Sequence, residues 1–198
     1  MKIILGSASP RRRELMSLIT ENYSVMTADV DERAIEASLK GLPAQEVAKG
    51  LGLAKARAVY ESLSEEDKKD AVVIGADTSV IIDNLILGKP VDKDDARAML
   101  TRLCGRKHSV ITGVALITHN GEKVIAEESF VEFAAADEYQ TNLIERYIST
   151  SDPYDKAGGY GIQGGGALLV KSVVGDYFNV VGMPVMKLAR ELHDMGAL

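Results

Sequence analysis

The alternation of apolar and polar positions divides the chain into short strands and amphipathic helices. The apolar run that ends at Leu5 predicts a short buried strand. Ser9 followed by Pro10 predicts an N-cap with proline at the first helical position, so a helix begins there. An extended run that becomes acidic follows, and a helix comes after it. Pro43 suits the first position of this helix, which continues to about Leu63. The stretch SEEDKKD that follows is expected to be solvated.

The second half of the chain shows the same alternation. Two β runs joined by Asp83 and Asn84 predict a hairpin with a two-residue turn, and Asn120 with Gly121 predicts another between two longer strands. The other predicted elements are a helix from about Asp92 to Gly105, a helix from about Asp137 to Tyr147, a strand over ALLVKSVVG, and a last helix between Pro184 and Gly196. The stretch STSDPYDKAGGYGIQGGG is too rich in glycine and turn residues for a regular element.

This order of elements favours one α/β domain over residues 1–198, with a mixed sheet curled into two lobes around a cleft. The chain is long enough for a sizeable core, and 46% apolar residues, 26% charged residues and a mean hydropathy near zero are ordinary for a soluble globular protein. Neither a secretory leader nor a long apolar span is visible, so we expect a cytoplasmic location.

Charge and cysteine content narrow the possible chemistry. The net charge of −6 argues against a general nucleic-acid binder, which would present a basic face, so any anion site must be local. Cys104 stands alone, and no internal disulfide can form. Its place at the end of an amphipathic helix, just before Gly105, favours a small buried thiol over a nucleophile.

The helix expected after Ser9 carries basic residues, Arg11–Arg13, in its first turn. The unpaired N–H groups of a first turn carry partial positive charge and favour acidic side chains instead. One interpretation is a solvated basic turn. The other is a phosphate site, because free backbone N–H groups, the hydroxyls of Ser7 and Ser9, and guanidinium forks together suit phosphate oxygens.

Asp77 is a carboxylate inside the otherwise apolar run VVIGADTSVII. An ionised carboxylate is too costly to bury without a partner. Two interpretations stay open: the strand is interrupted at Gly75 so that Asp77 caps a turn, or Asp77 faces a polar cleft and meets a cation. Thr78 would point to the other face if the strand continued.

Two lysines and a glycine-rich stretch become informative only together with these residues. Lys89 precedes Pro90, which favours an extended backbone beside the sheet. Alone, Lys89 and Lys55 are ordinary surface lysines, but either one would strongly attract a phosphate within contact distance. The glycines of GYGIQG form either a structural turn or a close approach to a ligand, with Gln163 presenting an amide to a base.

Other nucleotide-binding and catalytic systems are not supported. GYGIQG fits the pattern G-x-G-x-x-G, but a dinucleotide-binding fold needs a strand before it and a helix after it, and both flanks are wrong. The histidines at 108, 119 and 193 lack zinc-site spacing, and no G-x-S-x-G sequence supplies a serine nucleophile. Hydrolysis by water is still open.

The chain contains, in order, the blocks LGSASPRRREL, VDER, LAKARAV, GADTSVIIDNLILGKP, HSVITGVAL and DKAGGYGIQGGGALLVKSVVGDYFNVVGMP. In order and spacing these blocks, which span nearly the whole chain, resemble the Maf family of nucleotide pyrophosphatases. The resemblance implies a Maf/Ham-type, ITPase-like α/β fold with two lobes around a deep cleft, and often a homodimer. It also implies hydrolysis of a nucleoside triphosphate between the α and β phosphates, with a divalent cation such as Mg²⁺ or Mn²⁺.

The resemblance also implies roles for particular residues. Asp77 matches the family's proposed general base, and the residues that match the polar lining of the phosphate end are Ser7, Arg12, Glu32, Lys55 and Lys89. Glu32 and Asp77 are expected near the metal. Arg11, Thr78 and Gln163 resemble the branch that acts on dTTP and UTP, whereas the branch that acts on 7-methyl-GTP typically carries Trp, Gln and Glu there. Arg13 lies where the family is variable and receives no role.

We therefore expect a pyrophosphatase that acts on dTTP and UTP, and on modified pyrimidine nucleotides as a further possibility, with Asp77 taking the proton from the attacking water. The alternative is a nucleotide-binding regulator without turnover, in keeping with the family's link to inhibition of septum formation. Binding of nucleic acid through the arginines is disfavoured by the acidic composition. Pyrophosphate release distinguishes the first two hypotheses.

Overall fold

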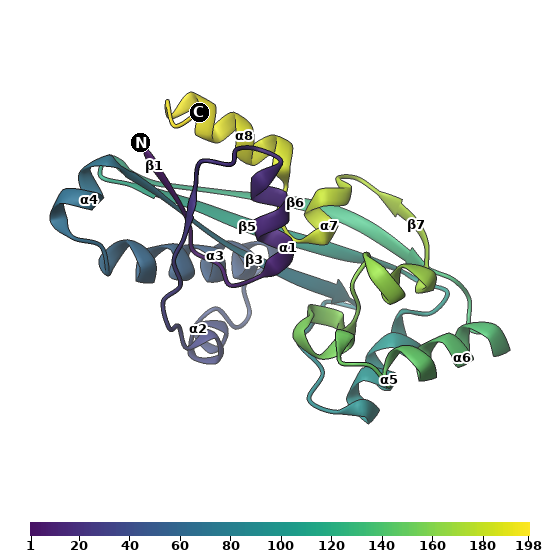
Figure 1. Ribbon diagram of the computed structural model, residues 1–198. Coiled ribbons are helices and arrows are strands. Elements are labelled where there is room, and N and C mark those ends of the chain that lie inside the picture. The colour runs from purple at the N-terminus through teal and green to yellow at the C-terminus, as the bar shows by residue number, and fades with distance from the viewer. The chain divides into compact units, whose positions relative to one another are not determined.

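The structure is a computed structural model that describes residues 1–198 (Figure 1). Its elements are β1 (Lys2–Leu5), α1 (Pro10–Ser17), β2 (Ser24–Val25), α2 (Glu32–Ser38), α3 (Ala44–Glu61), α4 (Glu65–Asp70), β3 (Ala71–Ile82), β4 (Leu85–Leu87), α5 (Lys93–Leu103), β5 (Lys107–Thr118), β6 (Gly121–Phe133), α6 (Glu138–Tyr147), the 3-10 helices η1 (Asp152–Asp155), η2 (Ala157–Gly159) and η3 (Gly164–Leu169), β7 (Val170–Val174), α7 (Tyr177–Val181) and α8 (Val185–Asp194).

The strands form a mixed sheet, as the sequence predicts. Their order is β2-β1-β3-β5-β6-β7, with β4 paired to β3. β1 runs parallel to β2 and to β3, and its residues Lys2–Leu5 are in register with Ala71–Ile74. The pairs β3/β4 and β6/β7 are antiparallel. The α/β class and the mixed sheet are therefore confirmed.

Local sequence signals place several helix starts and turns correctly. Ser9 caps α1 by accepting a hydrogen bond from the backbone N–H of Arg12, with proline in the first turn, and Asp92 and Asp137 cap α5 and α6 in the same way. The residues 83–84 connect β3 to β4 with φ of 54° and 60°, the left-handed conformations that a type I′ turn requires. β5 and β6 are neighbours joined by His119 and Asn120, so both predicted hairpins are confirmed, although the second turn lies one residue earlier than predicted and Gly121 is the first residue of β6.

Other boundaries differ from the prediction. The stretch SEEDKKD forms the short helix α4, because the Ser64 hydroxyl accepts a hydrogen bond from the N–H of Asp67 at 3.1 Å and acidic residues fill the first turn. α2 is a separate helix capped by Asp31, and Pro43 is the N-cap of α3 rather than its first residue. Helices α2 and α4 therefore begin at capping side chains, in parts of the chain where the apolar pattern gives little indication of a helix.

The glycine-rich stretch and the end of the chain also differ. The stretch predicted to lack regular elements contains η1, η2 and η3, and β7 begins at Val170 because Ala167–Leu169 belong to η3. The five-residue helix α7 was not expected from the sequence. None of the helices combines the length and apolar character that a membrane crossing requires.

The chain divides into two compact units built from separate segments. Unit 1 comprises Met1–Thr78, Thr112–Glu127 and Gly182–Leu198, and unit 2 comprises Ser79–Ile111 and Glu128–Val181. Each has its own core: Val59, Val73 and Ile117 belong to that of unit 1, and Leu100, Phe133 and Leu169 to that of unit 2. The chain passes between the units within β3, β5 and β6, so neither unit is one continuous segment. A single domain over residues 1–198 stays a prediction.

Within unit 1, helix α3 lies directly on β3 and β5 because glycines line the contact. A Cβ atom at Gly75 would stand 2.3 Å from the carbonyl oxygen of Gly52, and one at Gly113 would stand 2.4 Å from the backbone of α3. No side chain fits at such distances. This contact, which we call the glycine seam, fixes the relative position of Lys55, one turn beyond Gly52, and Asp77, two residues beyond Gly75.

Candidate functional site

Three of the predicted site residues form an ion cluster in unit 1. Lys55, on α3, places Nζ 2.7 Å from Oδ1 of Asp77 and 3.1 Å from Oε1 of Glu32. The side chains of Lys55 and Asp77 are only 17% and 15% exposed, whereas that of Glu32 is 42% exposed. The ammonium therefore bridges two carboxylates, one of them well shielded from water.

This cluster decides between the two interpretations of Asp77. β3 continues without interruption through Gly75, so a turn capped by Asp77 is wrong. The carboxylate meets a cation instead, the ammonium of Lys55. Thr78 is the next residue of the same strand and bonds different partners, as the alternation of a continuous strand predicts.

Arg12 extends from α1 toward three uncharged acceptors. Its Nε donates to the carbonyl of Gly182 at 2.9 Å, its Nη2 to the hydroxyl of Thr78 at 3.1 Å, and its Nη1 to the hydroxyl of Ser7 at 3.4 Å. Burial lowers the pKa of the guanidinium, although the nearby Asp77 carboxylate opposes this effect. A partly buried cation bonded to neutral groups favours an anionic ligand, since such a ligand would supply the missing charge.

The start of α1 is therefore not a uniformly solvated basic turn. Ser7 is buried and accepts a hydrogen bond from the N–H of Ser9 at 3.3 Å, so the segment between β1 and α1 is ordered by its own hydroxyls. Arg11 is partly buried, and its charge contributes to the lowered pKa of Arg12. Arg13, on the same turn, is exposed. The phosphate interpretation is favoured for Arg12 in particular.

Two groups that contact the predicted residues were missed. The hydroxyl of Thr112, on β5, lies 2.9 Å from that of Thr78 and is fully buried. A hydroxyl inside the apolar run VITGVAL is the same kind of anomaly as Asp77, so the same reasoning could have found it. The contact of Arg12 with the carbonyl of Gly182 could not be predicted from the sequence, because every residue has a backbone carbonyl and only the fold decides which one a side chain meets.

Lys89 and Gln163 belong to unit 2, and both are exposed. Lys89 lies just beyond β4, as predicted, and Gln163 directly precedes η3 in an extended conformation, with φ −95° and ψ 154°. 3-10 helices flank GYGIQG on both sides, without the strand and helix that dinucleotide binding requires, so its rejection is confirmed. That these two residues act with the cluster of unit 1 stays a prediction.

The cluster also bears on a divalent cation. No group of three or more His, Cys, Asp or Glu side chains is arranged to hold a metal ion by itself. Mg²⁺ is often bound through one or two carboxylates together with substrate phosphates and water. Glu32 and Asp77, whose oxygens already converge on one positive charge, fit that mode of binding.

The residues set aside as catalysts have environments that agree with this choice. Burial raises the pKa of the Cys104 thiol, although a hydrogen bond with Gln140 opposes it, so little thiolate forms at neutral pH. His108 is buried, bonds the hydroxyl of Tyr160 at 2.7 Å, and has its pKa lowered to about 4 by burial. His108 is thus buried in unit 2, and Cys104, predicted to be buried, is partly buried against the core of that unit.

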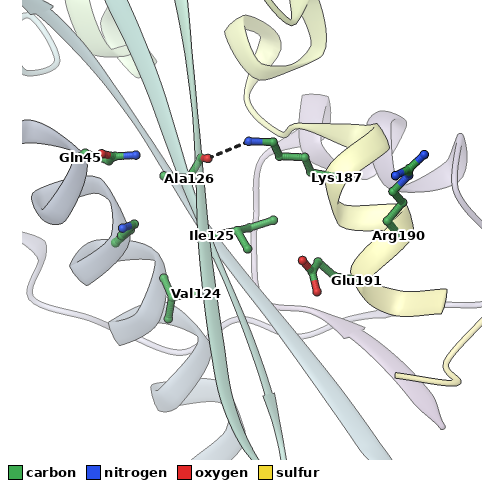
Figure 2. Close-up of a pocket in the computed structure, with 8 residues that line it drawn as sticks. Gln45, Val124, Ile125, Ala126, Lys187, Arg190 and Glu191 are labelled. Atoms are coloured by element: carbon green, nitrogen blue, oxygen red, sulfur yellow. Dashed lines mark hydrogen bonds between the residues drawn. The ribbon is translucent and has the colours of Figure 1, made fainter. Parts of the chain in front are cut away.

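A separate pocket of about 430 Å³ lies in unit 1 and contains none of the predicted site residues (Figure 2). It is lined by Gln45, Lys49, Val124, Ile125, Ala126, Lys187, Arg190 and Glu191. Lys187 donates to the carbonyl of Ala126 and pairs with Glu127, and Lys49 pairs with Glu46. Because Lys49 and Lys187 are already paired with carboxylates and the lining itself includes the carboxylate of Glu191, the pocket is a poorer anion site than the surroundings of Arg12.

Comparison with known protein families agrees with the resemblance seen in the sequence blocks. A family model described as Maf-like protein matches residues 2–195. The chain belongs to the Maf family. Two relatives similar to this Maf protein carry the name dTTP/UTP pyrophosphatase. That of Symbiobacterium thermophilum is 44% identical over 195 residues, covering 98% of this chain and 94% of the relative. That of Bacillus velezensis is 44% identical over 193 residues, covering 98% and 96%.

The fold of this Maf protein also resembles a solved structure. The Ham1 protein of Staphylococcus aureus matches it with a TM-score of 0.55 and 14% sequence identity, over 98% of this chain and 100% of that chain. At this identity the likeness concerns the fold alone. The Maf/Ham type of α/β fold is therefore confirmed.

Proposed function

We propose that this protein is a nucleoside triphosphate pyrophosphatase that hydrolyses dTTP and UTP to the monophosphate and pyrophosphate. The observation that carries the proposal is the arrangement in unit 1, where Arg12 bonds only neutral acceptors and lies near enough to Asp77, the partner of Lys55, for that carboxylate to affect its pKa. The names of the relatives, which match over nearly their full length, support the choice of substrate. Modified pyrimidine triphosphates are included in the proposed substrate class.

Asp77 is the general base of the proposed reaction. Lys55 occupies its Oδ1, so Oδ2 takes a proton from the water that attacks the α phosphorus. The new bond joins that water oxygen to phosphorus, and the bond from phosphorus to the bridging oxygen breaks as pyrophosphate leaves. A general base of this kind typically contributes about 10² to 10⁴ in rate.

The basic residues receive the charge of the leaving pyrophosphate. Arg12 can exchange its hydroxyl partners for phosphate oxygens, because Nη1 and Nη2 now bond the neutral side chains of Ser7 and Thr78. Lys55 and Lys89 are the other proposed cations at this end of the substrate. Stabilising charge where it develops is the main way in which such sites accelerate phosphoryl transfer.

A divalent cation, Mg²⁺ or Mn²⁺, is part of the proposal. Glu32 and Asp77 would hold it, with phosphate oxygens and water completing its ligands. When bound, it would neutralise phosphate charge and orient the substrate. Lys55, which contacts both carboxylates, keeps them close together.

For the base of the nucleotide, we assign Arg11, Thr78 and Gln163. Thr78 is held by its bond with Thr112, which remains when Arg12 turns to phosphate. An exposed amide such as that of Gln163 can both donate to and accept from a pyrimidine. We also propose that the protein works as a homodimer in the cytoplasm.

The test is a panel of triphosphates, namely dTTP, UTP, CTP, ATP, GTP and 7-methyl-GTP, each incubated with the purified protein with and without Mg²⁺ or Mn²⁺. We expect equimolar monophosphate and pyrophosphate from dTTP and UTP, only with a divalent cation. Cleavage of 7-methyl-GTP or purines in preference to dTTP and UTP would contradict the branch assignment. Nucleotide binding without pyrophosphate release would contradict the proposed activity and favour a regulator.

A further inference from the structure

An ionic network around one buried lysine lies in unit 2, in the segment that connects α6 to β7 (Figure 1), and the proposed mechanism does not use it. The side chains of its two carboxylates, Asp152 and Asp155, are 42% and 60% exposed. Lys156 is only 8% exposed. Its Nζ lies 2.8 Å from Oδ1 of Asp152, 2.5 Å from the carbonyl of Asp152 and 2.6 Å from Oδ1 of Asp155. A buried lysine with this many partners is held in one place.

Tyr147 connects this network to the glycine-rich backbone. Its hydroxyl donates to Oδ2 of Asp152 at 2.5 Å and accepts a hydrogen bond from the N–H of Gly161 at 3.1 Å. The chain of bonds therefore runs from the ammonium of Lys156 through a carboxylate and a phenol to a backbone amide. That amide lies two residues before Gln163, the proposed contact to the base.

The backbone around Gln163 packs tightly on the same two side chains. A Cβ at Gly161 would stand 2.7 Å from Cε of Lys156, and one at Gly165 would stand 3.2 Å from Cδ2 of Tyr147. A Cβ at Gly166 would stand 2.2 Å from the carbonyl oxygen of Gly161. The segment 161–166, which we call the glycine loop, thus closes on itself, and its exposed residue Gln163 lies between the two ends that touch.

Protonation keeps the network in a single state near neutral pH. Burial, and then the hydrogen bond to Asp152, raise the pKa of Tyr147, so its hydroxyl remains a donor. Burial acts to raise the pKa of Asp152, but hydrogen bonds from Lys156 and Tyr147 outweigh it and hold the pKa below its ordinary value. The phenol and the carboxylate therefore keep opposite roles, as donor and acceptor.

We propose that Tyr147 and Lys156 are positioning residues for base recognition: they hold both ends of the glycine loop so that the amide of Gln163 is presented to the base. Neither residue contacts the nucleotide in this proposal. The inference rests on the proposed function, in which Gln163 contacts the pyrimidine. It adds the reason why an exposed glutamine between glycines has a defined position.

The first test is Tyr147→Phe, with Tyr154→Phe as the matched control. Tyr154 is in the same unit and donates to the carbonyl of Ile148 at 2.8 Å, so its variant also loses one partly buried hydroxyl but leaves the glycine loop bonded. For Tyr147→Phe we expect the preference for UTP over ATP, measured as the ratio of their dissociation constants, to fall about tenfold, because the N–H of Gly161 loses the acceptor that holds the start of the glycine loop. Inhibition by inorganic pyrophosphate, which reports the phosphate end, should not change.

A purely structural role predicts a different result. Both variants would then lower the melting temperature to a similar extent, and both would leave the ratio of dissociation constants at its wild-type value. That outcome would overturn the proposal. Equal affinity of the wild type for UTP and ATP would overturn it as well, since there would be no base preference to maintain.

A second variant addresses the lysine directly. Lys156→Met keeps an unbranched stem but removes the ammonium, with Lys171→Met as control because Lys171 is an exposed lysine that pairs with Glu132 in the same unit. We expect only Lys156→Met to lose the preference for UTP. Because dissociation constants are measured without turnover, absence of pyrophosphate release in the wild type would contradict the proposed function while leaving this test decisive.

Discussion

The two units hold their candidate site residues in contrasting ways. In unit 1, Arg12, Lys55 and Asp77 are themselves bonded and partly buried. In unit 2, Gln163 is exposed, and the one buried charge, that of Lys156, packs against Gly161 at the start of the glycine loop instead of lying on the loop. In the proposed function, charged side chains recognise the phosphate directly, whereas the base is recognised by a glycine loop that Tyr147 and Lys156 hold in place.

The contrast follows from the chemistry of the two ends of a nucleotide. Phosphate oxygens carry charge, and guanidinium and ammonium groups interact with them strongly even when hydroxyls must first be displaced. A pyrimidine offers neutral donors and acceptors, whose bonds discriminate only when the partner is held in position. Each prediction below tests one side of this contrast.

The largest expected effect is on the charged side. Asp77→Asn should lower turnover of dTTP or UTP at least about hundredfold, because the amide cannot take the proton from water, while nucleotide binding is retained. Pyrophosphate release at saturating nucleotide and a calorimetric dissociation constant measure the two quantities. Glu122→Gln is the matched control, since Glu122 is a carboxylate of the same unit bonded by Arg57 at 2.6 Å. Turnover near the wild-type rate in Asp77→Asn would remove Asp77 as the base.

The next effect concerns the interior of unit 2, where His108 bonds Tyr160, the residue just before the glycine loop. Burial lowers the pKa of His108 to about 4 from its ordinary 6.5, so between these values the unfolded chain binds a proton that the folded protein does not. Stability is therefore full above pH 6.5 and should fall by about 3 kcal/mol as the pH drops through this window. Urea unfolding at a series of pH values measures the free energy.

The variant His108→Gln isolates this contribution. It should lack that part of the pH dependence, whereas His193→Gln, which changes an exposed histidine, should follow the wild type. Identical slopes of unfolding free energy against pH in the wild type and His108→Gln would show that His108 is not the group responsible.

The smallest of the three effects is Arg12→Lys. The ammonium keeps the charge but cannot reach the acceptors on Ser7, Thr78 and Gly182 together, so we expect KM to rise about tenfold and inhibition by pyrophosphate to weaken in parallel. Arg13→Lys, on the exposed side of the same turn, should leave both constants unchanged. Equal KM and pyrophosphate inhibition constants for the two variants would mean that the positive charge at position 12 is sufficient for phosphate binding and that the several N–H donors of the guanidinium are not needed.

The sequence predicted features that depend on neighbouring residues. Ser9 before Pro10 started α1, and Asp83 with Asn84 made the turn of the first hairpin, because capping and positive φ are local properties. Ser64 three residues before Asp67 was an equally local signal for α4, but the density of charge around it suggested only a solvated stretch.

The partners of the site residues could not be predicted in the same way. Lys55 lies 22 residues from Asp77, and their contact depends on how closely α3 approaches β3. The burial of Lys156 was hidden for a related reason, since its partners come from a turn-rich segment whose 3-10 geometry has no clear sequence pattern. Residue types indicated the chemistry, and tertiary packing decided which of them meet.

The glycine seam limits how substitutions can change the distance between Lys55 and Asp77: they can increase it but not decrease it. At Gly52, Gly75 and Gly113 a mutation can only add atoms, and added atoms push helix and strand apart. Substitutions there can widen the gap between Lys55 and Asp77, but none can narrow it. The backbones of α3, β3 and β5 are already in contact at the seam, so Lys55 and Asp77 are as close as the packing of the helix on the sheet allows.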